Sequence, residues 1–264
     1  MSSLFSTQEY RLYRFEYPQN LFHFLRPLIS PTFRSEELTV LDLGCGTGLV
    51  AESFLQFYPF PLALHLVDAD LEMLEQAKIQ FANHDQIKSC DCAKAENLPF
   101  LKESFDLILI GSAWHWMNQE LALKEIERVL KPGGFVFIFE YQFPKAVQLP
   151  ELNDWIRNQF NSAWKPSHQT PRGSLKELTE CWRSSSWFSQ ANSCGVVQDR
   201  LHHASELAGV IVSQSRYQHF EKYLPHDEKS KARQQLVKKL DQFLKCGSGN
   251  FRYIYEGYLF KKYL

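Results

Sequence analysis

The feature that most constrains this chain is a glycine-rich loop that directly follows an apolar, β-branched segment. Residues 38–43 read Leu-Thr-Val-Leu-Asp-Leu, and Gly44, Gly46 and Gly48 come immediately after them. Glycines allow a tight turn and a close approach of a ligand to the backbone, and a helix that begins there offers free N–H groups. We therefore expect a strand–loop–helix unit of an open α/β sheet, in which ligands bind beyond the carboxyl ends of the strands.

The alternation of apolar and helical segments continues after this loop. Each expected strand is apolar on both faces, which is typical of a parallel sheet covered by helices on both sides. Asp70 is expected to cap a helix whose apolar face includes Leu74 and Phe81. The expected strands are residues 38–43, 62–67, 86–89, 105–110 and 135–139, and the expected helices are residues 18–28, 49–58, 70–81 and 119–130. The sequence predicts an α/β fold.

The second half of the chain has a different organisation. Residues 145–190 are polar and rich in tryptophan, with helical stretches and no clear strand. Residues 195–197 are expected to form a strand, and residues 222–245 a charged helix. Aromatic residues alternate over residues 251–260, which predicts a final strand. The sheet is therefore expected to resume after a helical insertion.

Composition disfavours several classes of partner. Lys and Arg number 29 against 30 Asp and Glu in 264 residues, and a net charge of −1 gives no field to attract nucleic acid. No apolar run approaches the ~20 residues that a membrane span needs, and the first residues do not resemble a secretion signal. The six cysteines lack the spacing of a disulfide scaffold, and Cys90 and Cys92 lack further zinc ligands. We expect a cytoplasmic protein with free thiols and no metal, nucleic acid or membrane partner.

The spacing of the glycines indicates which nucleotide the loop binds. A dinucleotide-binding loop follows the pattern G-x-G-x-x-G/A, whose third small residue lets the helix pack closely. Leu49 occupies that third position here, and the glycines instead follow G-x-G-x-G. Asp42 precedes the loop, and Asp68 ends the next strand, where a carboxylate can accept hydrogen bonds from both ribose hydroxyls. The loop therefore departs from the dinucleotide-binding pattern, while Asp68 is placed to bind a ribose.

Several segments resemble class I S-adenosylmethionine-dependent methyltransferases. Residues 40–48 read Val-Leu-Asp-Leu-Gly-Cys-Gly-Thr-Gly, the form that the loop takes in that family. Residues 95–100, 112–117 and 130–134 are similar to the family's adenine-side loop, its Ala-x-His-Trp-Phe motif and its Leu-Lys-Pro-Gly-Gly segment. Residues 13–22 resemble, with the arginine shifted, the Tyr-x-x-x-Arg-Pro-x-Tyr-Pro motif of the trans-aconitate methyltransferase-type group.

The resemblance implies a fold and a domain organisation. The family fold is Rossmann-like, with a seven-stranded, mostly parallel sheet, one antiparallel strand, helices on both faces and a helical insertion as a lid. The whole chain, residues 1–264, is then expected to be a single methyltransferase domain. Its expected parts are an N-terminal helical lid (1–35), a cofactor-binding core (36–144), a helical insertion that caps the substrate (145–192) and the end of the core sheet with intervening helices (193–264).

The resemblance also implies a cofactor and a set of site residues. The cofactor is S-adenosyl-L-methionine, which leaves as S-adenosyl-L-homocysteine. The implied cofactor-binding residues are Asp42, Gly44, Cys45, Gly46, Gly48, Asp68, Ala69, Met73, Ala95, Glu96, Ser112 and Ala113. The implied catalytic residues are His115, Trp116 and Arg14, and the implied substrate pocket comprises Tyr13, Tyr17, Trp114, Arg216 and Tyr217. Lys94 stands where many class I enzymes have an aspartate beside the adenine.

His115 has two possible roles, and the chemistry of the methyl acceptor decides between them. A hydroxyl or amine must lose a proton, and histidine is the natural base near neutral pH. A carboxylate is already ionised, so His115 would only position it, while Arg14 or Arg216 would bind further carboxylates. Trp114 and Trp116 are expected to form a wall that excludes water and favours the sulfonium cation.

Several functions remain open at this stage. The leading hypothesis is a methyltransferase that acts on a small organic molecule, and the chain is expected to be a monomer or a homodimer. A related alternative is a carboxyl methyltransferase acting on a carrier-bound acyl chain, for which the basic helix from Lys229 to Lys245 is the candidate docking face. Alternatives from other classes are an NAD-dependent oxidoreductase and a cofactor-binding protein without catalysis.

Overall fold

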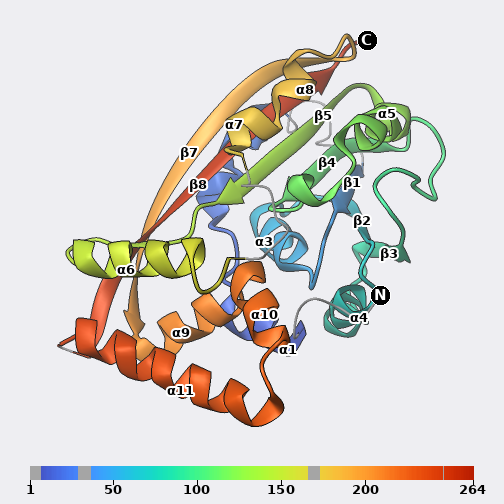
Figure 1. The fold of residues 1–264 in the computed structure, drawn as a ribbon. Helices are drawn as coiled ribbons and strands as arrows, with labels where there is room; N and C mark the ends of the chain where they lie inside the picture. The colour runs from blue at the N-terminus through green and yellow to red at the C-terminus, as the bar shows by residue number, and fades with distance from the viewer. Residues whose placement is uncertain (1–6, 29–36, 166–172, 246) are drawn as a thin grey trace. The chain divides into compact units, whose positions relative to one another are not determined.

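A mostly parallel sheet runs in the order β3-β2-β1-β4-β5-β8 in the computed structural model, which describes residues 7–28, 37–165, 173–245 and 247–264 (Figure 1). The strands are β1 Leu38–Leu43, β2 Leu62–Asp68, β3 Ile87–Cys92, β4 Phe105–Gly111, β5 Leu130–Tyr141 and β8 Ser248–Lys262. All pairs up to β5 are parallel, and β8 runs antiparallel to β5. This arrangement confirms the predicted fold class.

Two further strands bring the sheet to eight within the described residues, where seven were expected. The long strand β7 (Phe188–His203) pairs with β8, and the two-residue strand β6 (Lys145–Ala146) pairs with Arg252 and Phe251 of β8. The extra strand is β6, which is too short to leave a periodic signal in the sequence.

The chain divides into two compact units. The sheet unit comprises Glu16–Tyr141, Arg172–Val196 and Tyr255–Leu264. The helical unit comprises Met1–Phe15, Gln142–Pro171 and Val197–Ile254. Strands β7 and β8 each contribute residues to both units. The boundaries between the units therefore fall at other residues than those of the predicted parts.

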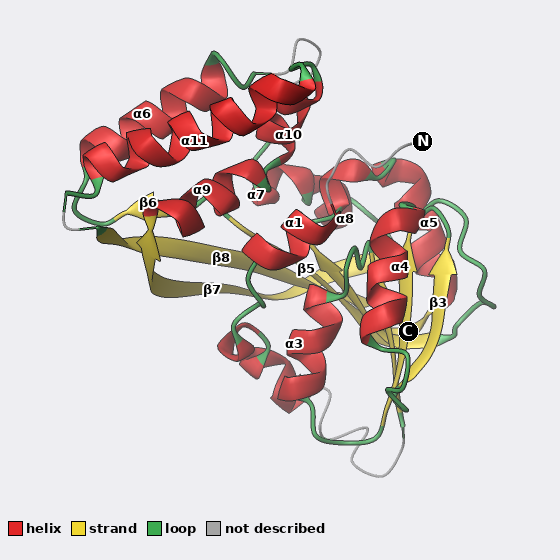
Figure 2. Ribbon diagram, turned by 90° about the horizontal axis from the view of Figure 1, so that it is seen from below, coloured by secondary structure: helices red, strands yellow, loops and turns green. Residues whose placement is uncertain are grey.

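The helices of the sheet unit begin and end at recognisable signals. They are α3 Leu49–Phe57, α4 Leu71–Gln80, α5 Gln119–Val129, α7 Leu175–Leu178 and α8 Glu180–Arg183 (Figure 2). The Asp70 side chain accepts from the N–H groups of Glu72 and Met73 at the start of α4, as predicted. Asn118 caps α5 through the N–H of Leu121. α3 ends just before Pro59, which cannot continue a helix.

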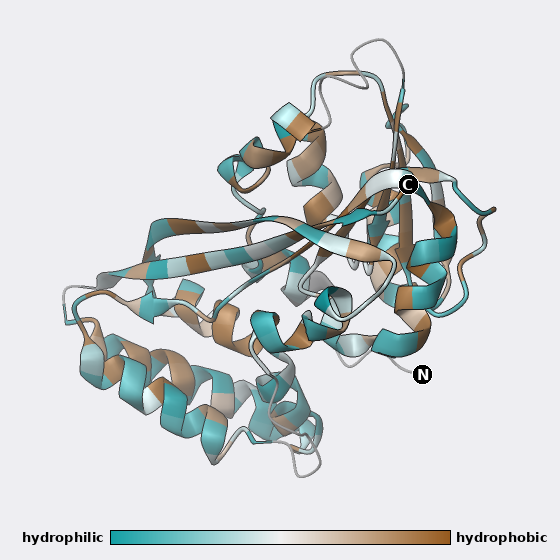
Figure 3. Cartoon of the chain, turned by 90° about the horizontal axis from the view of Figure 1, so that it is seen from above, coloured by the Kyte–Doolittle hydropathy of each residue, from teal (hydrophilic) through white to brown (hydrophobic). Residues whose placement is uncertain are grey.

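Strand β4 lies at the centre of the hydrophobic core. Its residues from Phe105 to Ile110 are all buried, and strands β1 and β5 flank it. Apolar side chains of α5, including Ile126 and Val129, belong to the same buried cluster. Figure 3 shows the corresponding colouring, with brown central strands and helices that are brown on one side and teal on the other. Burial on both faces explains why β4 is continuously apolar from Leu107 to Ile110.

The helical unit contains short helices around the long helix α11. Its helices are α1 Thr7–Tyr13, α6 Pro150–Asn161, α9 Ala204–Val212, α10 Ser215–Lys222 and α11 His226–Phe243. Glu221, which is buried, accepts from Nε and Nη2 of Arg233, so a two-point ion pair joins α10 to α11. Pairing of a buried carboxylate in this way offsets the cost of removing it from water.

Three expected elements differ from the structure. The helix predicted over 222–245 is divided between α10 and α11, because Pro225 stands at the start of α11. The helix predicted over 18–28 contains two 3-10 turns, η1 (Gln19–Leu21) and η2 (His23–Leu25). The insertion expected to lack strands contains β6 and the beginning of β7.

Candidate active site

The glycine loop lies between β1 and α3, as the sequence predicts. Gly44, Gly46 and Gly48 have φ values of 75°, 55° and 89°, which other residues adopt only with strain. The N–H groups of Gly44 and Cys45 both donate to the carbonyl of Val67 at the end of β2, at 2.8 and 3.0 Å. The loop is therefore folded back onto the carboxyl end of the neighbouring strand.

One side of this loop has room for a ligand. A Cβ on Gly44 would lie 2.4 Å from the Cβ of Ala113, and a Cβ on Gly48 would lie 2.5 Å from the Phe81 ring. A Cβ on Gly46 would meet only the Cε of Met73, at 3.6 Å. Gly44 and Gly48 are thus required by packing, whereas Gly46 leaves an accessible backbone.

Asp42 is a fully buried carboxyl at the base of the loop. Its Oδ2 accepts from the N–H of Ala51 at 3.1 Å, and its Oδ1 has no partner among the described residues. Burial raises the pKa of Asp42 from 3.8 to about 8, the hydrogen bond from Ala51 opposes this shift, and Asp68 adds to it. An unsatisfied oxygen in a buried carboxyl is costly unless a ligand supplies a donor.

Asp68 connects β2 to the glycine loop. Its Oδ2 accepts from the N–H of Gly46 at 2.7 Å, and its Oδ1 accepts from the N–H of Asp70 at 2.8 Å. Burial raises the pKa of Asp68, and these backbone hydrogen bonds oppose the shift. The bonds fix the orientation of the carboxylate beside Ala69, and Met73 is buried on the adjoining turn of α4.

The loop between β3 and β4 carries two more of the predicted cofactor residues. Ala95 is buried, and the Oε1 of Glu96 accepts from the N–H of Asn118 at 2.6 Å. Glu96 therefore joins this loop to the start of α5, a role that the sequence did not reveal. Lys94 is exposed, and its carbonyl accepts from the N–H of Asn97 at 3.0 Å.

Ser112 marks the end of β4 with an uncommon backbone conformation. Its φ is 54°, and its N–H donates to the carbonyl of Phe139 at 2.7 Å. The Tyr17 hydroxyl donates to Ser112 Oγ at 2.9 Å. Ala113, the next residue, is buried and adjoins Gly44 of the glycine loop. The predicted cofactor residues Gly44, after β1, and Ala113, after β4, therefore lie side by side.

A 3-10 turn, η3 (Trp114–Trp116), carries the predicted catalytic histidine. His115 is half-buried, and its ring lies 4.8 Å from that of Trp116 between centroids. The Trp116 side chain is 53% exposed, so it is available to an incoming acceptor. The turn places His115 two residues after Ala113, beyond the carboxyl end of β4.

Trp114 does not line a pocket, contrary to the prediction. It is buried in the core cluster, its ring lies 5.1 Å from that of Trp182, and its Nε1 donates to the carbonyl of Leu178 at 2.8 Å. Trp182 stacks in turn on Phe260. Trp114 therefore anchors η3 in the hydrophobic core, and only Trp116 of the pair faces solvent.

Four predicted site residues belong to the helical unit. Arg14 donates from Nε to Ser213 Oγ and from Nη2 to the Ser213 carbonyl, both at 3.1 Å. Tyr13 packs on Gly209 of α9, where an added Cβ would lie 2.0 Å from the Tyr13 ring. Arg216 donates to a backbone carbonyl, and Tyr217 is buried against Trp164. Tyr217 is therefore a core residue, a correction to its predicted place in the pocket.

Tyr17, like Trp114, is a predicted pocket residue that belongs to the sheet unit. It is buried, and its N–H donates to Ser53 Oγ on α3 at 2.9 Å.

Met117 lies in the motif at residues 112–117 but was not among the predicted site residues. Its Cε would lie 3.3 Å from a Cβ on Gly44, so its side chain adjoins the glycine loop. The described residues contain no cluster of three side chains that could hold a metal ion.

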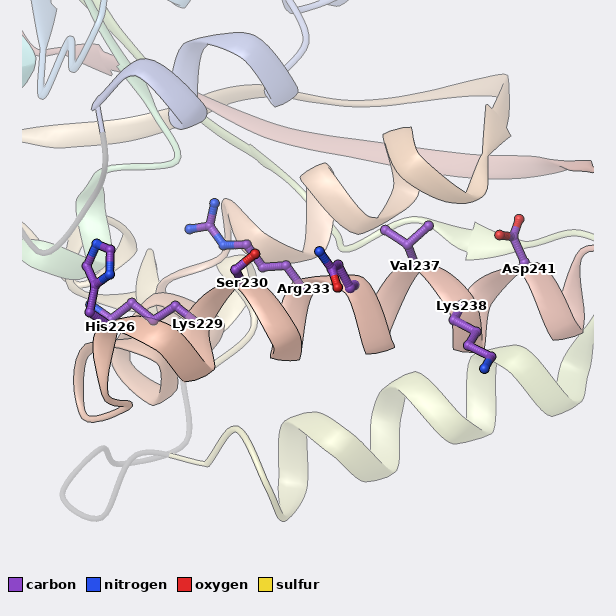
Figure 4. Close-up of a pocket in the computed structure, with 8 residues that line it drawn as sticks. His226, Lys229, Ser230, Arg233, Val237, Lys238 and Asp241 are labelled. Atoms are coloured by element: carbon purple, nitrogen blue, oxygen red, sulfur yellow. The ribbon is translucent and has the colours of Figure 1, made fainter.

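A separate groove of about 650 Å³ runs along α11 in the helical unit (Figure 4). Its lining residues are His226, Lys229, Ser230, Arg233, Gln234, Val237, Lys238 and Asp241. The positive side chains outnumber the negative ones in this lining, although the guanidinium of Arg233 is paired with Glu221.

None of the helices in the described ranges combines the length and the apolar composition that a membrane-spanning helix needs.

Residues 41–138 match a family described as a methyltransferase domain. An uncharacterized methyltransferase of Schizosaccharomyces pombe is 36% identical over 126 residues, which cover 48% of this chain and 47% of the relative. A malonyl-[acyl-carrier protein] O-methyltransferase of Herminiimonas arsenicoxydans is 37% identical over 95 residues, which cover 36% of this chain and 34% of the relative. The matches thus span about half or less of the length of these relatives.

The fold has solved counterparts. A structure described as a putative type II methyltransferase from Anaeromyxobacter dehalogenans superposes with a TM-score of 0.64 at 17% identity. The match covers 95% of this chain and 97% of that one. At this level of identity the likeness concerns the fold.

Proposed function

We propose, on the premise that this chain carries a class I S-adenosylmethionine-dependent methyltransferase domain, that it transfers a methyl group to the carboxylate of a small organic acid. The observation that carries the proposal is the contact between the glycine loop and the turn that holds His115, through Gly44 and Ala113. This contact brings the cofactor-binding loop and the candidate acceptor-binding histidine to the same edge of the sheet.

The residues of the site fit the cofactor. S-adenosylmethionine supplies an electrophilic methyl group on a sulfonium when it is bound. The partly accessible backbone at Gly46 and the carboxylate of Asp68 would hold its amino-acid and ribose parts. The Oδ1 of Asp42, which has no partner among the described residues, offers an acceptor for a ligand N–H or O–H. The buried Ala95 would contact the adenine from the loop before β4.

The acceptor would be positioned by His115 and Trp116. A carboxylate has a pKa of ~4 and is ionised at neutral pH, so methylation of it requires no base. His115 would then hold the acceptor through a hydrogen bond, while the exposed indole of Trp116 would exclude water from the reacting atoms. If the acceptor is a hydroxyl or amine, the same imidazole would remove its proton.

The arginines predicted to bind further carboxylates are already engaged. Arg14 is bonded to Ser213, and Arg216 to the carbonyl of Phe160. We therefore place the acceptor's principal contacts at His115 and Trp116, and expect the acceptor to have one essential carboxylate.

The test is release of S-adenosylhomocysteine near pH 7 from a panel of mono-, di- and tricarboxylates, aconitate included. We expect turnover with at least one acid and recovery of its methyl ester. Absence of any ester across the panel, with S-adenosylhomocysteine binding intact, would contradict the carboxylate acceptor and leave the methyltransferase class in place.

A second candidate acceptor is an acyl chain on a carrier protein. The groove along α11 favours it, because Lys229 and Lys238 have no ion-pair partner in the described part of the chain and suit an acidic carrier surface. A relative that methylates malonyl on acyl-carrier protein supports this candidate by its name. Substitution of both lysines by glutamate is expected to raise the KM for the malonyl-carrier protein about tenfold. Lys231→Glu is the control, because Lys231 does not line the groove and its substitution should leave this KM nearly unchanged.

We further propose a cytoplasmic location. Within the described residues Cys45, Cys90, Cys92, Cys181 and Cys194 are all free thiols, as expected in a reducing compartment. An alkylation assay on freshly lysed cells would show them as reduced. We expect the purified chain to be a monomer or a homodimer, which sedimentation would distinguish.

A further inference from the structure

The backbone of Ser112 is held in a conformation that it would not adopt by itself. Its φ of 54° lies in the left-handed region, and among the described residues only Glu103 shares this feature without being glycine. Such a conformation costs about 1–3 kcal/mol and persists only where neighbouring groups enforce it. The N–H of Ser112 is fixed by the Phe139 carbonyl, and its side chain is fixed by Tyr17.

Tyr17 is itself rigidly placed. Its N–H donates to Ser53 Oγ at 2.9 Å, and Ser53 Oγ donates to the Leu49 carbonyl in the first turn of α3. Its ring meets those of Phe139 and Tyr141 edge-on, with centroids 5.0 and 6.2 Å apart. The Tyr17 hydroxyl is thus a fixed donor that links the helix after the glycine loop to the end of β4.

The direction of the chain after Ser112 determines how the glycine loop packs. Ala113 is the next residue, and its Cβ lies 2.4 Å from the position that a Cβ on Gly44 would take. On the far side, Trp114 is held independently by the Leu178 carbonyl and the core. Loss of support at Ser112 would therefore displace Ala113 first, and through it the cofactor loop.

We propose that Tyr17 is a positioning residue for cofactor binding. It acts through Ser112, whose left-handed backbone it supports, and so keeps Ala113 packed against Gly44. The inference rests on the proposed function only in that the loop binds S-adenosylmethionine and its product. It assigns Tyr17 to the alignment of the cofactor loop, whereas the sequence placed it in the substrate pocket.

The experiment measures binding of S-adenosylhomocysteine by calorimetry, which requires no knowledge of the acceptor. Tyr17→Phe keeps the ring and removes the donated hydrogen bond. We expect its Kd for S-adenosylhomocysteine to rise about tenfold, because the variant lacks a hydrogen bond that holds Ser112 in its left-handed conformation. Tyr253→Phe removes a comparable buried hydroxyl, bonded to His202, and should bind as the parent does.

Rescue distinguishes positioning from general packing. Glycine adopts a positive φ without strain, so Ser112→Gly should keep the backbone path without help from Tyr17. We expect the Tyr17→Phe/Ser112→Gly double variant to bind S-adenosylhomocysteine at least about threefold more tightly than Tyr17→Phe alone. Tyr17→Phe/Glu103→Gly relaxes the other left-handed residue, in the loop before β4, and should show no rescue.

Each outcome decides a separate point. Normal binding by Tyr17→Phe, or a Tyr17→Phe/Ser112→Gly variant that binds no more tightly than Tyr17→Phe, would overturn the inference and leave the proposed function intact. Failure of the unmodified, folded chain to bind S-adenosylhomocysteine would overturn the proposed function and the inference together. A tenfold loss that is rescued at residue 112 and not at residue 103 would establish the role of Tyr17.

Discussion

The Cβ of Ala113 lies 2.4 Å from the point where a side chain on Gly44 would begin. This separation is shorter than any ordinary contact between two carbon atoms. Position 44 therefore cannot carry a side chain while position 113 has its Cβ in this place. The relationship joins the loop after β1 to the turn after β4, which are more than 60 residues apart in the sequence. It explains why the first glycine of the loop is required by tertiary packing as well as by its φ of 75°.

Gly44→Ala is therefore expected to weaken S-adenosylhomocysteine binding strongly. The substitution adds a clash with Ala113 to the cost of a positive φ, together at least 2 or 3 kcal/mol, or ~30-fold or more in S-adenosylhomocysteine affinity. Gly195→Ala is the matched control, because nothing lies within 4 Å of its added Cβ. Calorimetric titration of both variants checks the prediction, and equal affinities would contradict it.

Substitution of His115 should separate its two possible roles. If it positions a carboxylate, His115→Gln keeps a hydrogen-bond donor and should retain kcat within about tenfold, whereas His115→Ala should lose about 100-fold. Both variants should bind S-adenosylhomocysteine within twofold of the parent. Equal and large losses in the two variants would instead identify His115 as the base. Steady-state kinetics with an identified acceptor provides the measurement.

The two tryptophans of η3 should respond differently to the same change. Trp114→Phe removes the donor to the Leu178 carbonyl inside the core, and should lower the free energy of unfolding by about 1–3 kcal/mol. Trp116→Phe alters a side chain that is 53% exposed, so the free energy of unfolding should change by less than about 0.5 kcal/mol. Urea unfolding of the two variants is the check, and similar midpoints would be inconsistent with the anchoring role of Trp114.

Acidification should destabilise the chain through His202. This residue is buried with its Nε2 2.8 Å from the Tyr253 hydroxyl. Burial lowers the pKa of His202 below its ordinary 6.5, with Glu206 opposing the shift and Arg200 adding to it. The unfolded state then binds more protons below about pH 6.5, so the free energy of unfolding falls as the pH drops. His202→Gln should flatten this dependence in urea unfolding between pH 7.5 and 5.5.

Asp42 should produce a dependence of the opposite sign. Because its pKa is raised from 3.8 to about 8, the folded chain retains a proton that the unfolded chain releases. Stability from this group is present below pH 3.8 and is lost as the pH rises towards 8. Asp42→Asn cannot ionise, so it should unfold at a higher urea concentration than the parent at pH 8 and weaken S-adenosylhomocysteine binding. An unchanged midpoint at pH 8 would show that Asp42 carries no such penalty.

Part of the site could be predicted because it depends on local chemistry. The loop from Gly44 to Gly48 and the cap at Asp70 follow from residue types at fixed spacing. The exposure of Trp116 and burial of Trp114 could not be predicted, because both are large and apolar and the sequence places them two residues apart. The burial of His202 could not be predicted either, because it depends on a hydrogen-bond partner, Tyr253, that lies 51 residues away in the sequence.

The sequence by itself determined the order of strands and helices through β5 and the strand–loop–helix unit at Asp42. These follow from hydrophobic periodicity and from backbone freedom at glycine, which act over a few residues. Only the tertiary structure decided that Ser112 adopts a positive φ, that Tyr17 supports it and that Ala113 closes on Gly44. Those features depend on hydrogen bonds and packing between distant segments, which no local pattern encodes.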